Sequence, residues 1–286
     1  MPPNDFNTFC EQNRRDIDLL CNRFADYQPL QGFDAARFQT WLRQFQAQHR
    51  LIAVKLAKAL TYYSMHSLTG LMRSLKETID AQINLEPVER SSVFYVPLGR
   101  LEESGSDIVR RFRNANRLHS QKSQFKEVIE LQDVLIKVQS PVFVFMDDFV
   151  GTGKQVSDTW RDSLSQVVPE FIPMYLAVVA AFKEGIKKIE AETPLRVLCV
   201  HPLGTRVQLM ESAFLVLSKH EKATVKAYCD KAGNQPLGFG DRGLLVSFAY
   251  GTPNNTISVI RGSKGQDPWL GLLPTWEDLP YLQNLR

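Results

Sequence analysis

The first third of the chain alternates apolar and polar residues with a helical period. Asp34 is followed by apolar residues with the spacing of one helix face, which predicts a capped helix over residues 34–48. A second helix is predicted over residues 51–63, and Ser67 has the position of an N-cap for a third. We therefore expect residues 6–85 to be all-helical.

Two of these helices meet near residues 64–66 and have the length and spacing of a helix-turn-helix or winged-helix unit. The same region is basic, because no acidic residue lies between Asp34 and Glu77. The positive electrostatic potential of a basic region attracts the phosphate groups of nucleic acids, so residues 37–76 are a candidate nucleic-acid surface. A solvated helical face is the alternative. The basic residues are Arg37, Arg43, Arg50, Lys55, Lys58, Arg73 and Lys76.

The pattern changes after a polar stretch around Pro87, which predicts a boundary between domains at 1–88 and 89–286. Short β-rich runs then alternate with helical segments. This alternation predicts an α/β domain with a mostly parallel sheet covered on both faces. The expected strands are residues 93–97, 142–146, 172–179, 196–200 and 244–249, and the expected helices include 107–118, 122–138, 156–167, 182–191, 206–217 and 221–231.

Composition narrows the class of protein only modestly. A net charge of +3 is too small to indicate a nucleic-acid binder by itself. No window approaches the roughly 18 apolar residues needed to span a bilayer, and the first residues lack the order of a signal peptide. The four cysteines are scattered, which favours free thiols in a reducing compartment. We therefore expect a cytoplasmic protein without a membrane segment.

The chemistry concentrates in residues 142–155, which read VFVFMDDFVGTGKQ. In an open α/β sheet, ligands bind beyond the carboxyl ends of the strands, where Asp147 and Asp148 are expected. Carboxylates accept hydrogen bonds from the vicinal hydroxyls of a ribose. The glycine-bounded turn at 151–153 presents backbone N–H groups to an anion, and the N-terminus of the following helix adds partial positive charge. A plain N-cap pair is the alternative interpretation of the two aspartates.

The Gly153-Lys154 dipeptide superficially suggests the P-loop of nucleotide hydrolases. That motif requires a glycine five residues before its Gly-Lys and a serine or threonine after it. Asp148 and Gln155 occupy those positions here. An aspartate inside a phosphate cradle repels the nucleotide, so we reject the P-loop interpretation.

The segment instead resembles the PRPP-binding motif of type I phosphoribosyltransferases, where PRPP is phosphoribosyl pyrophosphate. It is similar in particular to the phosphoribosyltransferase-like family of bacterial conflict systems, in which Gln155 is expected in the loop. Two further stretches carry this resemblance, Pro-Leu-Gly at 97–99 with Ser-Gly at 104–105, and Thr-Pro-Asn-Asn at 252–255. Together they extend the likeness over roughly residues 30–276.

The resemblance implies a site for a 5-phosphoribosyl group. By analogy Asp147 and Asp148 are the catalytic pair that holds the ribose hydroxyls, and the 5′-phosphate lies on the following loop. The loop at 98–106 takes the pyrophosphate position, and Mg²⁺ binds with PRPP, mainly through substrate oxygens and indirectly through Asp147. The substrate-binding candidates are Gly151, Thr152, Gly153, Lys154, Gln155, Arg100, Ser104, Gly105, Asn254 and Asn255.

These features predict a phosphoribosyltransferase-like effector of an antiphage or toxin-type system. Catalysis in that fold is mainly positioning and charge stabilisation, so no dedicated nucleophile is required. One alternative is a non-enzymatic regulator that senses a nucleotide and binds DNA or RNA through its N-terminal helices. Another is a subunit that works with partner proteins inside a defence complex. Asn254 and Asn255 suit either base recognition or turn formation.

Overall fold

The computed structural model describes residues 5–99, 104–262 and 269–275. The chain folds into two compact units. Unit one combines residues 1–65 with residues 204–286, and unit two comprises residues 66–203. Each unit has its own sheet and its own core, so each is described by itself.

Unit two is built around a four-stranded parallel sheet with the order β2-β3-β4-β5. Its strands are β2 (Val93–Pro97), β3 (Val142–Val150), β4 (Met174–Phe182) and β5 (Arg196–Leu203). The central strands β3 and β4 are almost continuously apolar because both of their faces are covered. The mostly parallel α/β sheet predicted from the sequence is therefore confirmed.

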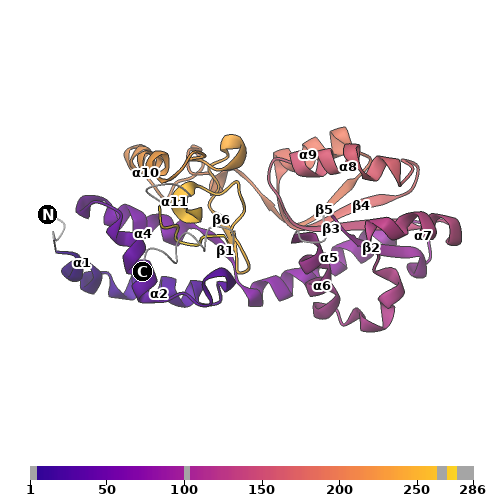
Figure 1. Ribbon diagram of the computed structural model, residues 1–286, viewed down its shortest axis with the longest axis horizontal. Coiled ribbons are helices and arrows are strands. Elements are labelled where there is room, and N and C mark those ends of the chain that lie inside the picture. The colour runs from indigo at the N-terminus through magenta and orange to yellow at the C-terminus, as the bar shows by residue number, and fades with distance from the viewer. Residues whose placement is uncertain (1–4, 100–103, 263–268, 276–286) are drawn as a thin grey trace. The chain divides into compact units, whose positions relative to one another are not determined.

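Helices cover both faces of this sheet (Figure 1). On one face lie α8 (Lys154–Asp162) and α9 (Lys183–Glu192), and on the other lie α5 (Met65–Ile83) and α6 (Ser104–Ala115). The connection from β2 to β3 also contains α7 (Leu131–Lys137). Phe143, Phe145, Trp160 and Ile189 belong to one buried cluster that joins the sheet to α8 and α9. Short 3-10 helices occur at Arg90–Ser92, Leu118–Gln124, Val128–Glu130 and Leu164–Gln166.

Unit one packs helices from both ends of the chain around a two-stranded parallel sheet of β1 (Thr61–Tyr63) and β6 (Val246–Phe248). Its core contains Phe38 and Trp41 from the N-terminal part, with Val259 and Ile260 from the C-terminal part. The Trp41 indole N–H donates to the Val259 carbonyl at 2.8 Å. The helices are α1 (Phe6–Gln12), α2 (Arg14–Phe24), α3 (Ala35–Arg43), α4 (Arg50–Ala59), α10 (Lys219–Ala232) and α11 (Ser258–Arg261).

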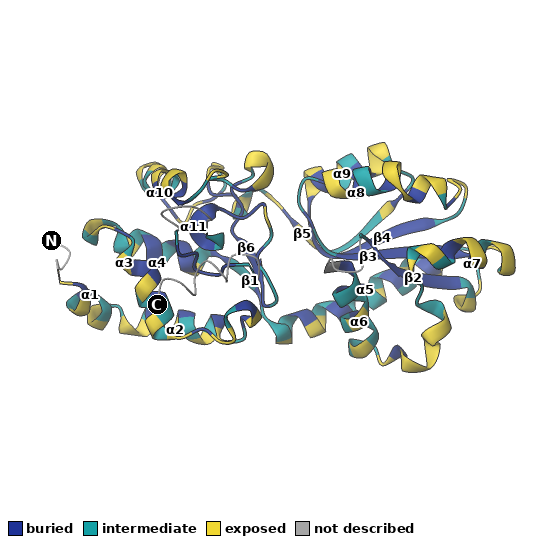
Figure 2. Ribbon diagram, in the orientation of Figure 1, coloured by how far each residue is buried: buried dark blue, intermediate teal, exposed yellow. Residues whose placement is uncertain are grey.

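The compact units divide the chain differently from the boundary expected at residue 88. Residues 204–262 and 269–275 pack with the N-terminal helices, because both segments contribute apolar side chains to one core (Figure 2). Helix α5 (Met65–Ile83) begins at the last residue of the first segment of unit one, and the rest of the helix belongs to unit two. A long-range association of this kind leaves no local mark in the sequence.

Several predicted elements differ in the structure. The expected helix over 122–138 is α-helical only at Leu131–Lys137, and shorter 3-10 helices precede it. The expected helix over 51–63 ends at Ala59, and Thr61–Tyr63 forms β1, as suits a β-branched and aromatic triplet. Because β1 lies between α4 and α5, these helices do not form a helix-turn-helix. The expected helix over 206–217 is a 3-10 turn followed by a loop, in which Leu215 is 86% exposed. The strand near 244–249 pairs with β1 instead of joining the main sheet.

The four cysteines are free thiols in the structure, in agreement with their scattered positions in the sequence. Burial raises the pKa of the Cys199 thiol to about 11 and that of Cys229 to about 12. Both thiols therefore remain protonated at neutral pH, which makes them poor nucleophiles. Over the described residues, no helix combines the length and apolar character required to cross a bilayer.

Candidate functional site

Asp147 and Asp148 lie inside β3, near its carboxyl end, because the strand continues to Val150 instead of ending at Met146. Asp147 is 4% exposed, whereas Asp148 is half-buried. An oxygen of the Asp147 carboxylate accepts the backbone N–H of Asp148 at 2.8 Å. Neighbouring residues in a strand point to opposite faces of the sheet. The two carboxylates are therefore not equivalent, and Asp148 is the more accessible one.

The turn after β3 leads directly into α8. Gly153 is the N-cap of α8 and has a φ angle of 77°, which is the left-handed region that glycine adopts most readily. The Thr152 hydroxyl accepts the backbone N–H of Lys154 at 3.3 Å. Gln155 is exposed on the first turn of the helix. The turn thus places successive backbone groups beside the N-terminus of a nine-residue helix.

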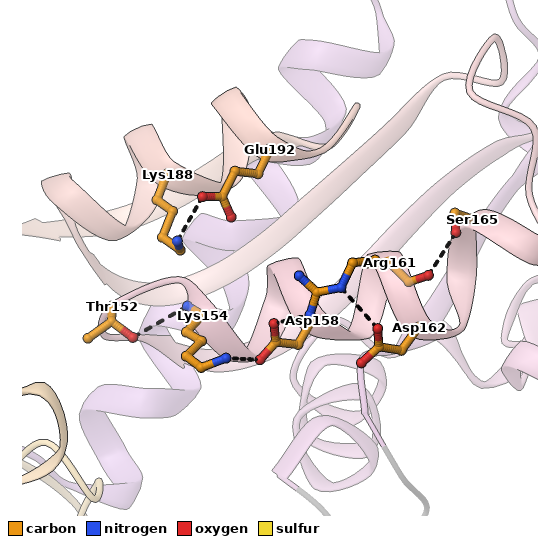
Figure 3. A network of polar contacts seen from close by, with 8 residues as sticks. All are labelled: Thr152, Lys154, Asp158, Arg161, Asp162, Ser165, Lys188 and Glu192. Atoms are coloured by element: carbon orange, nitrogen blue, oxygen red, sulfur yellow. Dashed lines mark hydrogen bonds and ion pairs between the residues drawn. The ribbon is translucent and has the colours of Figure 1, made fainter.

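The Lys154 side chain extends along α8 (Figure 3). Its ammonium group lies 2.5 Å from a carboxylate oxygen of Asp158, one turn further on. Arg161 donates to the other oxygen of Asp158 and to Asp162. Hydrogen bonds from Lys154 and Arg161 hold the pKa of Asp158 below its ordinary value. The Lys154 charge is therefore partly neutralised within α8 in this structure.

The loop after β2 begins next to the acidic pair. The Leu98 N–H donates to the carbonyl of Met146 at 2.9 Å, so this loop leaves the sheet beside the residue that precedes Asp147. Gly105, at the start of α6, is also near Leu98: a Cβ there would lie 2.9 Å from the Leu98 nitrogen and would overlap the Leu98 carbonyl oxygen. The close approach explains why a glycine is required.

For the two other candidates in this loop, Arg100 and Ser104, the structure gives no side-chain contacts. Arg100 lies outside the described residues, and so does the Ser104 side chain. The structure therefore places the first residue of the loop after β2 beside β3, next to the residue that precedes the acidic pair.

Asn254 and Asn255 belong to unit one. Asn255 is 5% exposed, and its side-chain amide donates to the Phe239 carbonyl at 2.8 Å. The carbonyl of Asn254 accepts the Phe239 N–H at 2.8 Å, and the Asn254 residue itself is exposed. In the same segment, Thr252 is buried and its hydroxyl donates to the Leu273 carbonyl at 2.8 Å. These contacts give the Thr-Pro-Asn-Asn segment a structural role as a tie between loops of unit one.

The basic segment 37–76 does not present its charges as a continuous field. Lys55 pairs with Glu221 at 2.7 Å, and Lys58 pairs with Asp16 at 2.9 Å. Lys76 pairs with Asp80 at 2.5 Å. Acidic residues from distant parts of the sequence and from the same helix therefore offset these lysines.

The arginines of this segment are also engaged. Arg37 donates to the Gly271 carbonyl, and burial lowers its pKa to about 10. The guanidinium carbons of Arg43 and Arg50 lie 4.0 Å and 4.8 Å from the centre of the Phe6 ring. Distances of this size are typical of cation–π contacts. The part of the segment that lies in unit one, residues 37–65, thus has its charges largely engaged in internal contacts, which the acid-free stretch of sequence did not indicate.

The sequence interpretation missed Gly185, in the first turn of α9. A Cβ at this position would overlap the carbonyl oxygen of Gly151. An isolated glycine in a helical pattern commonly has a packing reason, and that signal was present in the predicted helix at 182–191. Among the described residues, no group of three or more histidine, cysteine, aspartate and glutamate side chains is placed to hold a metal ion.

The sequence profile of the PRTase-CE family matches residues 38–275. The chain belongs to the PRTase-CE family. Members are phosphoribosyltransferase-like proteins of conflict systems, so the predicted resemblance is confirmed. The match includes the acidic pair, the loop after it and the Thr-Pro-Asn-Asn segment.

Among solved structures, the chain is similar to the crystal structure of orotate phosphoribosyltransferase from Aeropyrum pernix. The two share 15% sequence identity with a TM-score of 0.29, over 48% of this chain and 76% of that one. No curated protein matches the chain.

Proposed function

We propose that this PRTase-CE protein binds PRPP or a related ribosyl phosphate through the loop after β3, and transfers the ribosyl group as the effector of an antiphage or toxin-type system. The observation that carries the proposal is the direct succession of three features in β3 and α8: the acidic pair, the glycine-bounded turn and a helix N-terminus. A ribose 5-phosphate has hydroxyls and a phosphate at complementary positions, and the family membership supports this ligand class.

Each residue has a distinct task in this proposal. The half-buried carboxylate of Asp148 accepts the hydrogen bonds of the ribose hydroxyls. Asp147 orders the strand end by accepting the Asp148 N–H. The backbone N–H groups of residues 151–154 and the partial charge of α8 hold the 5′-phosphate. The loop that begins at Leu98, which leaves the sheet beside Met146, takes the pyrophosphate in this proposal.

Magnesium is the expected companion of PRPP in this site. The strand end offers carboxylate oxygens, which are the hard ligands that Mg²⁺ prefers, and this ion commonly binds through one or two carboxylates plus substrate phosphates. The residues present therefore fit such an ion, which the half-buried carboxylate of Asp148 would hold, with an indirect contribution from Asp147. When bound, the ion offsets the negative charge of pyrophosphate as that group departs.

Calorimetry on the full chain tests this function. We expect PRPP with Mg²⁺ to bind in the micromolar range, and ribose 5-phosphate more weakly, because it lacks the pyrophosphate. Adenosine and free ribose serve as controls without a 5-phosphate and are expected not to bind. Absence of binding by every ribosyl phosphate overturns the proposal. For the effector role, phage titres on cells carrying the wild type and Asp148→Asn should differ if ribosyl chemistry is needed.

The acceptor of the ribosyl group is best sought by mass. An intact-mass search for additions of a phosphoribosyl group, in nucleic acid and in protein from cells expressing the chain, separates these two acceptor classes. Pyrophosphate release from PRPP by the purified protein, with no other nucleophile present, indicates that water is the acceptor and that ribose 5-phosphate is the second product. If PRPP binds tightly and releases no pyrophosphate, the protein is instead a sensor without transfer activity.

A further inference from the structure

The loop after β3 lies directly on the first turn of α9, and two glycines make this approach possible. A Cβ on Gly153 would lie 2.7 Å from the carbonyl oxygen of Gly185 and 3.2 Å from a side-chain carbon of Ile189. A Cβ on Gly185 would lie 2.8 Å from a methyl carbon of Val150 and would overlap the carbonyl oxygen of Gly151. Each glycine therefore clears space for the backbone of the other segment.

The helix gains nothing locally from Gly185. Glycine is less favourable than alanine in a helix by about 1 kcal/mol, because it loses more conformational freedom. Gly185 has no positive φ angle, so an alanine fits the local backbone. The penalty for a side chain at this position comes from its collisions with Gly151 in the loop and with the Val150 side chain at the end of β3.

Of the two segments, α9 is the fixed one. Ile189 is fully buried in the core that joins α9 to the sheet, and β4 leads into the helix without an intervening residue. The loop at 151–153 has glycines at both ends and includes the partly exposed Thr152. A collision at Gly185 therefore displaces the loop rather than the helix.

We propose that Gly185 is a positioning residue for the phosphate-binding loop. It does not contact the ligand, and it sets the place of the Gly151 carbonyl and hence the direction of the backbone N–H groups that follow. This inference rests on the proposed function for its ligand, whereas the placement of the loop is a property of the free protein.

The test is Gly185→Ala in the full chain, compared with Gly70→Ala as a matched control. Gly70 lies in α5, and a Cβ there meets no atom within 4 Å. Two quantities are measured for each variant: the Kd for ribose 5-phosphate or PRPP with Mg²⁺, and the hydrogen-exchange rates of amides 150–154 without ligand. We expect Gly185→Ala to remain folded, to change loop exchange and to weaken binding about tenfold or more. Gly70→Ala should match the wild type within about twofold.

The outcomes separate this inference from the proposed function. One outcome overturns the positioning role alone: the wild type binds the ribosyl phosphate, and Gly185→Ala has the same Kd and the same loop exchange rates as the wild type. Altered loop exchange in Gly185→Ala, with no ribosyl phosphate binding by the wild type, overturns the proposed function and supports the positioning role.

A measurement on the wild type covers the case in which Gly185→Ala does not fold. When the ligand binds to the wild type and orders the loop, amide hydrogen exchange in the first turn of α9 should be slower than without ligand, because the two backbones are in contact. Protection of the loop without protection of residues 183–187 overturns the inference.

Discussion

The ammonium nitrogen of Lys154 lies 2.5 Å from a carboxylate oxygen of Asp158, within α8 and directly after the loop at 151–153. The pair is exposed, and Arg161 shares the same carboxylate. A lysine in this position was a candidate phosphate ligand from the sequence. The structure shows its charge shared with an acidic neighbour. In the proposed site, the backbone of the loop is therefore the main source of phosphate affinity.

We therefore expect Lys154→Met to weaken ribose 5-phosphate binding only about twofold to fivefold, the range typical of an exposed, screened charge. Asp158→Asn should strengthen binding slightly, because it removes a negative charge and releases Lys154. Asp133→Asn, which breaks the exposed Lys137–Asp133 pair on α7, is the control and should have no effect. A loss of a hundredfold in Lys154→Met would show that the lysine turns to the phosphate in the complex.

The two aspartates of β3 should respond differently to substitution. Asp148→Asn should lower the affinity for PRPP about tenfold or more with little change in the melting temperature, because its carboxylate is partly exposed. Asp147→Asn should also destabilise the fold, by about 1–2 kcal/mol, because a neutral amide oxygen accepts the N–H of Asp148 more weakly than the buried carboxylate does. Calorimetry and thermal unfolding on the two variants check this division. Equal effects of both variants on stability would contradict it.

Unit one contains a pH-dependent link between its two chain segments. Lys55 on α4 pairs with Glu221 on α10, and the Lys55 hydrogen bond is the main reason that the pKa of Glu221 falls to about 2. A lowered pKa in the folded state stabilises the fold above pH 4.5, and this contribution is lost as the pH falls towards 2. Because both side chains are partly exposed, we expect the contribution to be at most about 1 kcal/mol.

Glu221→Gln tests this link while it keeps the capping box that Glu221 forms with Ser218. The variant should melt a few degrees below the wild type at pH 7 and together with it near pH 2. A difference that persists unchanged at pH 2 would show that the carboxylate charge is not the cause.

The internal pairing of residues 37–76 predicts weak nucleic-acid binding by the full chain. Lys55, Lys58 and Arg37 contact groups from residues 221, 16 and 271, so their charges are already engaged. Binding of duplex DNA or RNA should therefore show a shallow salt dependence, with few counterions released. A fragment of residues 1–90 is a misleading probe, because it lacks Glu221 and Gly271. Tight binding with a steep salt slope in the full chain would contradict the prediction.

The strand-turn-helix segment was predictable because its signals are local. The apolar run of β3, the acidic pair and the glycine-bounded turn lie within fourteen consecutive residues. Their order predicts a strand, two carboxylates and a turn at the start of a helix. The exact end of β3 was not predictable. Backbone pairing of Phe149 and Val150 with Ala180 and Ala181 extends the strand beyond the acidic pair, and that pairing depends on a neighbouring strand.

The sequence by itself determined the α/β character of unit two, the succession of acidic pair, turn and helix, and the family to which the chain belongs. The tertiary structure decided which segments share a core. Residues 204–262 and 269–275 pack with the N-terminal helices, Glu221 offsets Lys55, and the α9 glycine Gly185 lies against a loop more than thirty residues earlier. The physical reason is that periodicity and turn chemistry act over a few residues, whereas packing joins surfaces that the sequence keeps apart.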